Sequence, residues 1–154
     1  MFTPFGCIFL LFALAATLAG AAPSRLFARQ TGDLQCNIAR VKIVGSILQA
    51  AQTARNLTQE LSCGCGNSSS LIANVTSGII TAEDAVAEIV GAIFTGQAAP
   101  ASARTQVGDG LTLALESAGN ITSTDPAVTS NLATLTSQLI AAGQAGDDVL
   151  QDCN

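Results

Sequence analysis

Residues 125–154 read DPAVTSNLATLTSQLIAAGQAGDDVLQDCN, and this stretch decides the fold. Its apolar and small residues recur at alternating intervals of four and three, at Val128, Leu132, Leu135, Leu139, Ala142, Gly146, Val149 and Cys153. An unbroken heptad seam of this kind is typical of an α-helix that packs against other helices. Asp125 can cap such a helix and Pro126 suits its first position. We therefore predict a long C-terminal helix that begins at Pro126.

Three earlier stretches carry a similar helical spacing. The first, residues 33–61, presents two apolar sides, and a helix of this type usually contacts several neighbours. One side comprises Leu34, Ile38, Val41, Val44 and Leu48, and the other comprises Ile43, Ile47, Ala50, Ala54, Leu57 and Leu61. A further helix is expected over residues 101–118, although Gly108 and Gly110 weaken it.

Residues 69–95 are compatible with two interpretations. Their apolar residues keep a helical rhythm from Ile72 to Ile93, which indicates one long helix. Gly78 weakens this helix, however, and Thr81 followed by two acidic residues resembles the start of a second one. No β-strand alternation is sustained, and the connecting stretches are short. We therefore predict a single-domain, all-α fold, a compact antiparallel bundle of four or five helices.

Four cysteines remain once the N-terminal segment described below is removed, namely Cys36, Cys63, Cys65 and Cys153. If the first helix is continuous, Cys36 and Cys63 lie 27 positions apart, which is about 40 Å at 1.5 Å per residue. A disulfide requires Cα atoms within about 7 Å. This geometry predicts two bridges, Cys36–Cys153 and Cys63–Cys65. With five helices, Cys153 would instead lie beside Cys63 or Cys65, and Cys36 would have no partner within the molecule.

The Cys63-Gly64-Cys65 segment also suggests a small thiol–disulfide catalyst, because strained bridges are the more easily reduced ones. No His or Lys stands close to it in sequence to lower a thiol pKa, and the Cys-x-x-Cys spacing of thioredoxins is absent. The segment also lacks a nearby third ligand for a metal ion. A structural staple is the preferred interpretation.

The N-terminus has the features of an export signal. Residues 1–22 contain the mostly apolar run Phe9–Leu18 and end in small residues, as secretory signal peptides do. Residues 23–29 resemble a short pro-segment that is trimmed after Arg29, which leaves a mature domain of residues 30–154. No later apolar stretch is long enough to span a bilayer. We therefore expect a secreted, extracellular protein with no transmembrane anchor in its mature chain.

Four Asn-x-Ser/Thr triplets agree with export. They begin at Asn56, Asn67, Asn74 and Asn120, and each matches the acceptor pattern for N-glycosylation. Asn56 shares the polar side of the first helix with several glutamines, where a glycan would not disturb packing. The sequence therefore predicts a glycoprotein.

The composition excludes several classes of function. The chain contains no His, Trp or Tyr, so it lacks imidazole nucleophiles, bases and metal ligands. Its net charge of −5, with Phe94 as the single aromatic residue of the mature domain, disfavours nucleic-acid binding. Glu83, Asp84 and Glu88 are better explained as acidic residues near a helix start than as a glycosidase pair. We predict a non-enzymatic protein without catalytic residues, cofactor or metal.

Several short motifs together resemble the layout of small secreted, effector-like proteins from wood- and litter-degrading basidiomycete fungi. The motifs are a signal ending in Ala-Gly-Ala-Ala-Pro, the Arg29-Gln30 boundary, Asp33-Leu34-Gln35-Cys36-Asn37, Cys63-Gly64-Cys65 and the terminal Asp152-Cys153-Asn154. The chain is more distantly similar to the hydrophobic-surface-binding and cell-wall galactomannoprotein group. These resemblances imply an extracellular, effector-like or cell-surface role during growth on plant material, and no catalytic residues.

Two functional hypotheses follow. The first is an interaction protein that binds an extracellular surface, such as a cell wall, a hydrophobic solid or a secreted protein. The alternative is a carrier for a lipid, a sterol or a small aromatic metabolite. A carrier would need helices that open around Ile89, Ile93 and Phe94.

Overall fold

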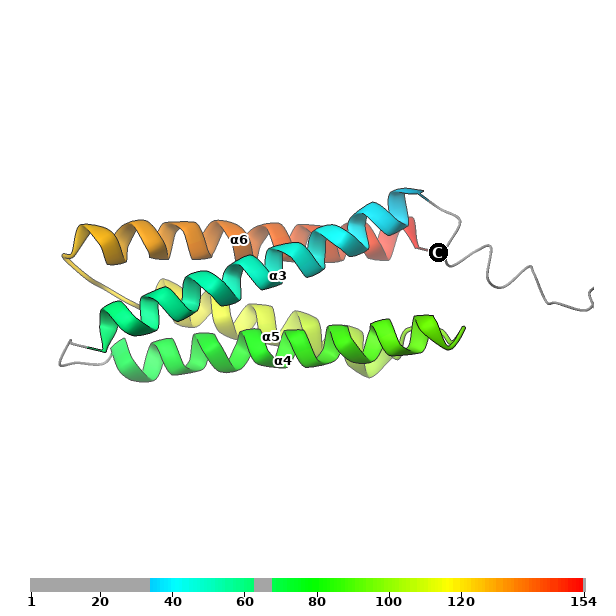
Figure 1. Ribbon diagram of the computed structural model, residues 1–154, viewed down its shortest axis with the longest axis horizontal. Coiled ribbons are helices and arrows are strands. Elements are labelled where there is room, and N and C mark those ends of the chain that lie inside the picture. The colour runs from blue at the N-terminus through cyan, green and yellow to red at the C-terminus, as the bar shows by residue number, and fades with distance from the viewer. Residues whose placement is uncertain (1–33, 63–67, 154) are drawn as a thin grey trace, which may run out of the picture.

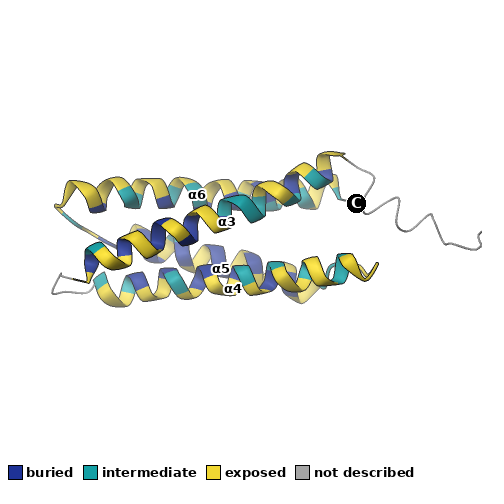
Figure 2. Ribbon diagram, in the orientation of Figure 1, coloured by how far each residue is buried: buried dark blue, intermediate teal, exposed yellow. Residues whose placement is uncertain are grey.

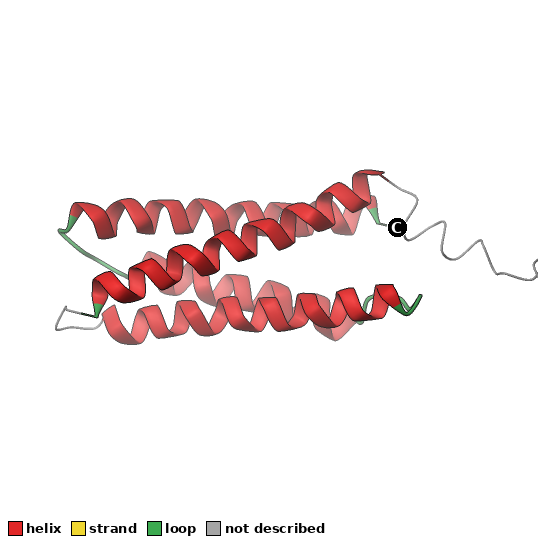
Figure 3. Ribbon diagram, viewed as in Figure 1, coloured by secondary structure: helices red, strands yellow, loops and turns green. Residues whose placement is uncertain are grey.

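The computed structural model describes residues 34–62 and 68–153, and all regular secondary structure in these residues is helical (Figure 3). The four helices of the described chain are α3 (Leu34–Leu61), α4 (Ser68–Phe94), α5 (Ala101–Gly119) and α6 (Pro126–Asp152). Each helix runs antiparallel to the one before it, in an up-down-up-down bundle (Figure 1). The prediction of an all-α fold is confirmed.

The open question over residues 69–95 is resolved in favour of one continuous helix, α4. Thr81 does not cap a new helix, because its hydroxyl donates a hydrogen bond to the Ser77 carbonyl oxygen at 2.9 Å, one turn earlier. Gly78 is buried within the helix and does not interrupt it. The described chain therefore contains four helices rather than five.

The start of α6 agrees with the sequence prediction. The Asp125 carboxylate accepts a hydrogen bond from the Ala127 backbone N–H at 2.8 Å, and Pro126 occupies the first helical position. This arrangement satisfies one of the backbone donors that a helix leaves unpaired at its N-terminus. Most of the predicted seam of α6 points inward, with Val128, Leu135, Leu139 and Ala142 buried.

The bundle is built from two helix pairs, α3 with α6 and α4 with α5, whose mutual contacts are the most extensive. In the α4–α5 pair, Gly78 and Gly110 face each other so closely that a Cβ atom built on either would lie 2.5 Å from the carbonyl oxygen of the other. Glycine at both positions lets the two backbones touch. The residues that weaken these helices locally therefore make their close packing possible.

The core is made mainly of small side chains, which is why the helices approach closely. Its largest fully buried members are Leu57, Val75, Leu135 and Leu139. Alanines fill much of the remainder, namely Ala50, Ala51, Ala54, Ala82, Ala85, Ala103, Ala114, Ala118 and Ala142. Burial decreases toward the end where α3 begins and α6 finishes, and more of the ribbon there is half-buried or exposed (Figure 2).

One expectation about α3 does not hold. Only the side containing Ile47, Ala54 and Leu57 is buried, whereas Leu34 and Val41 on the other side are 69% and 73% exposed. The physical reason is that α3 has two extensively packed neighbours in the described chain, α6 and α4, and these leave one side of the helix uncovered. The second apolar side is left facing outward.

Candidate functional site

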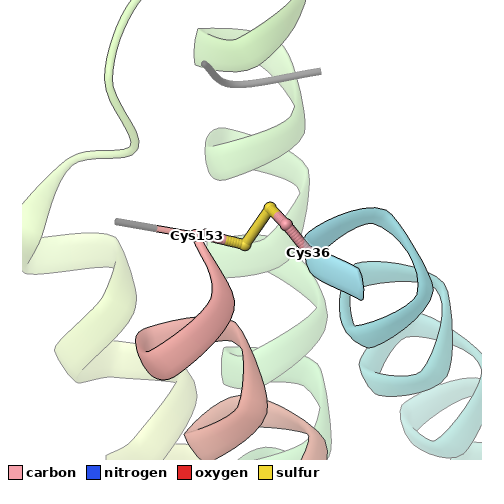
Figure 4. Close-up of a disulfide and its surroundings, with 2 residues drawn as sticks. All are labelled: Cys36 and Cys153. Atoms are coloured by element: carbon pink, nitrogen blue, oxygen red, sulfur yellow. A yellow bond between two sulfur atoms is a disulfide. The ribbon is translucent and has the colours of Figure 1, made fainter. Parts of the chain in front are cut away.

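A disulfide joins Cys36, in the first turn of α3, to Cys153, directly after α6 (Figure 4). The two Cα atoms lie 5.0 Å apart although the residues are separated by 117 positions in sequence. Cys36 is buried, with 1% of its surface exposed. The predicted Cys36–Cys153 bridge is confirmed. The reason is the one predicted: a continuous α3 separates Cys36 from residue 63, and the antiparallel order of four helices places Cys153 next to Cys36.

Side-chain contacts fix the register between α3 and α6 along their length. The Thr53 hydroxyl donates a hydrogen bond to Gln138 Oε1 at 2.9 Å. Nearer the other end, Asn131 Nδ2 donates a hydrogen bond to Glu60 Oε1 at 2.7 Å. Together with the disulfide, these pairs show that α3 and α6 keep one constant antiparallel alignment.

The end of the bundle that carries the disulfide, here called the disulfide end, also holds the apolar residues singled out from the sequence. Ile89 and Ile93 are half-buried in the last turns of α4. Phe94 ends that helix with 83% of its surface exposed, and Val90 beside it is also exposed. Across the bundle, α6 exposes Leu150 near the same end. Phe94, the single aromatic residue of the described chain, is therefore exposed to water.

The sequence-predicted glycosylation sites gather at the opposite end, where α3 leads to α4 and α5 leads to α6. Asn56 lies five residues before the end of α3, Asn74 six residues after the start of α4, and Asn120 directly after α5. Each is therefore within about 9 Å of that end along a helix. All three side chains are exposed, while the residue that follows each of them is buried. We call this end the sequon end.

Several predicted features lie outside the described residues. They are the signal and pro-segment of residues 1–29, Asn67, and the Cys63–Cys65 pair with its proposed bridge or redox activity. The Cys36–Cys153 bridge is accordingly the one disulfide within the described chain.

The acidic residues do not form a metal site in the part of the chain that the structure describes. No three Cys, Asp or Glu side chains there converge as metal ligands would. Asp84 and Glu88 are exposed on α4, and Glu83 is half-buried. The Glu60 carboxylate is better sheltered, and its second oxygen, Oε2, is buried without a hydrogen-bond partner.

Comparisons with known proteins give no further guide. No protein-family model, curated protein or solved structure matches this chain. Among the described helices, none is both long and apolar enough to cross a membrane.

Sequence reasoning found the bridge and the sequons but missed their segregation to opposite ends. The signal was present in the helix bounds, because residues near the end of one helix and the start of the next must lie at the same end of an antiparallel bundle.

Proposed function

We propose that this chain is a secreted, non-enzymatic interaction protein that binds an extracellular surface or a secreted protein through the disulfide end of its bundle. In this proposal the mature domain is residues 30–154, released from a signal peptide and a pro-segment. A second bridge between Cys63 and Cys65 closes the α3–α4 connection. The setting suggested by the sequence resemblance is fungal growth on plant material.

The observation that carries the proposal is the difference between the two ends of the bundle. Exposed apolar side chains such as Phe94, Val90 and Leu150 lie toward the disulfide end, whereas the described sequons lie at the other end. Glycans on Asn56, Asn74 and Asn120 would keep the sequon end in water. The disulfide end would stay bare and could lie against an apolar surface, where burial of its side chains contributes free energy in proportion to area.

Adsorption to hydrophobic beads tests this proposal. The mature chain is compared with the variant Val90→Ser/Phe94→Ser. Leu113→Ser on α5 serves as the control, because Leu113 is an apolar residue about as exposed as Val90. We expect the double variant to lose most of its adsorption and the control to retain it. Equal adsorption by all three, at equal helix content in circular dichroism, would rule out the disulfide end as the contact surface.

The carrier hypothesis remains the second candidate, because Ile89 and Ile93 are only half-buried beside exposed Phe94. A bound lipid or aromatic molecule would have to slide between the ends of α4 and its neighbours. Titration with apolar fluorophores separates the two functions. Tight, saturable one-to-one binding that weakens in Ile89→Ser or Ile93→Ser would favour the carrier, and adsorption without such binding favours the surface-binding protein.

A further inference from the structure

The three described Asn-x-Thr triplets are alike in sequence but differ in backbone structure. Asn56 lies within α3 and Asn74 within α4, and both of their triplets are entirely helical. Asn120 directly follows α5, and the residues after it, 121–125, belong to no helix. The structure therefore separates acceptor sites that the sequence makes equivalent.

Helical geometry keeps the two recognised groups of a triplet apart. N-glycosylation reads the Asn amide together with the third residue, since the triplet demands a Ser or Thr hydroxyl there. On an α-helix, residues two positions apart lie about 200° apart around the axis and do not face each other. Both hydroxyls are also engaged within their helices: Thr58 donates a hydrogen bond to the Ala54 carbonyl oxygen at 2.8 Å, and Thr76 donates one to the Ile72 carbonyl oxygen at 2.9 Å. An enzyme that must bind both groups at once cannot do so while α3 and α4 are intact.

The middle residue of each helical triplet is fixed in the core. Leu57 and Val75 are fully buried, with 0% of their surface exposed. Rearranging the backbone around Asn56 or Asn74 would therefore break helical hydrogen bonds and move an apolar side chain from the core into water. These two triplets become available only where the chain is unfolded, globally or locally.

The Asn120 triplet is not held in this way. Asn120 and Thr122 are both exposed, and only Ile121 between them is buried. Because residues 121–125 are in no helix, the chain can bend there to bring Thr122 beside Asn120 while α5 and α6 stay folded. Asn120 Nδ2 donates a hydrogen bond to the Glu116 carbonyl oxygen at 2.9 Å. This nitrogen carries two hydrogens, so a glycosylated Asn120 retains one for the same bond.

We infer that Asn120 is the described acceptor that the folded domain still offers for N-glycosylation, whereas Asn56 and Asn74 accept a glycan only before α3 and α4 form. In the reaction, the Asn120 amide nitrogen forms a bond to the anomeric carbon of a lipid-linked oligosaccharide. The bond from that carbon to the lipid pyrophosphate breaks, the pyrophosphate leaves with the electron pair, and the amide releases one proton. The inference rests on the secretion and glycosylation in the proposed function and adds the order in which the sites can be used.

Glycan transfer in vitro, from a lipid-linked oligosaccharide by an oligosaccharyltransferase, tests the inference. The acceptor is the unglycosylated mature chain, residues 30–154 with the disulfide intact. It carries Asn67→Gln, so that the triplet outside the described residues does not contribute. Peptide mass spectrometry gives the initial rate at each Asn. We expect Asn120 to be modified at least about tenfold faster than Asn56 or Asn74, because those two sites require local unfolding.

Synthetic peptides that span each triplet are the matched unfolded acceptors, since short isolated helices are marginal in water. All three peptides should be modified, and the preference for Asn120 should disappear. In the folded chain, Thr122→Ala should reduce transfer to Asn120 at least about tenfold, whereas Thr58→Ala should leave it unchanged. Equal rates at the three sites of the folded chain would overturn the inference, as would a folded chain that is not modified at Asn120 although its peptide is.

This assay depends neither on export nor on adsorption. Loss of the Asn120 preference would therefore leave the surface-binding function intact, and failure of bead adsorption would leave the order of glycosylation intact.

Discussion

Replacement of Gly110 by alanine tests directly whether α4 and α5 touch through their backbones. The new Cβ atom would lie 2.5 Å from the Gly78 carbonyl oxygen and 3.0 Å from the Ala82 backbone nitrogen. Both obstacles are main-chain atoms, so no side chain can rotate away. Relief requires the two helices to move apart by roughly 1 Å, to reach ordinary van der Waals separation.

Two opposing effects set the size of the change. Overpacking of a well-packed interface costs about 1–3 kcal/mol, and the upper part of that range applies where backbone must shift. Alanine is favoured over glycine inside a helix by about 1 kcal/mol, which offsets part of the cost. We therefore expect Gly110→Ala to lower the free energy of unfolding by about 1–2 kcal/mol.

Gly108→Ala is the matched control, because it lies two residues away on the same helix and a Cβ atom there would meet nothing within 4 Å. That variant should gain about 0.4–1 kcal/mol from reduced unfolded-state entropy. Urea unfolding followed by circular dichroism measures both variants. Were Gly110→Ala to stabilise the protein as much as Gly108→Ala, the close backbone approach and the reasoning built on it would be wrong.

Three further substitutions test other parts of the structure by the same urea assay. Cys36→Ser/Cys153→Ser should lower the free energy of unfolding by about 4–5 kcal/mol, the chain-entropy value for a loop of more than 100 residues. An unchanged urea midpoint would show that the bridge does not constrain the unfolded chain. Asp125→Ala removes the α6 cap and should cost about 1 kcal/mol, whereas Asp125→Asn should cost little. Asn131→Ala removes the side-chain donor to Glu60 Oε1, next to an Oε2 that already lacks a partner, and should cost about 1–2 kcal/mol. No loss would mean that water replaces the amide.

The predictions that succeeded depend on local geometry. The start of α6 was predictable because Asp125 and Pro126 act on the backbone within one turn of themselves. The Cys36–Cys153 pairing was predictable because a rigid helix sets a minimum distance between its ends. The cap acts whichever neighbours surround the helix, whereas the pairing also required four helices rather than five.

Other features could not be read from single segments. Gly78 has a low helix propensity, and only its contact with α5 explains why glycine stands there. From the sequence alone, one long helix and two shorter helices over residues 69–95 were therefore equally open. The two apolar sides of α3 are similarly alike in composition, and nothing local distinguishes the buried Ile47 and Leu57 from the exposed Val41 and Leu48.

The sequence by itself determined that the chain is helical, where its last helix begins and that Cys36 cannot reach Cys63 across a continuous first helix, because these depend on periodicity, capping and the length of a helix. Only the tertiary structure decided which side of α3 is covered. It also decided that Phe94, the most exposed of the large apolar residues, lies at the end opposite the described sequons. These properties depend on which helices become neighbours, and burial is a property of that arrangement rather than of any one segment.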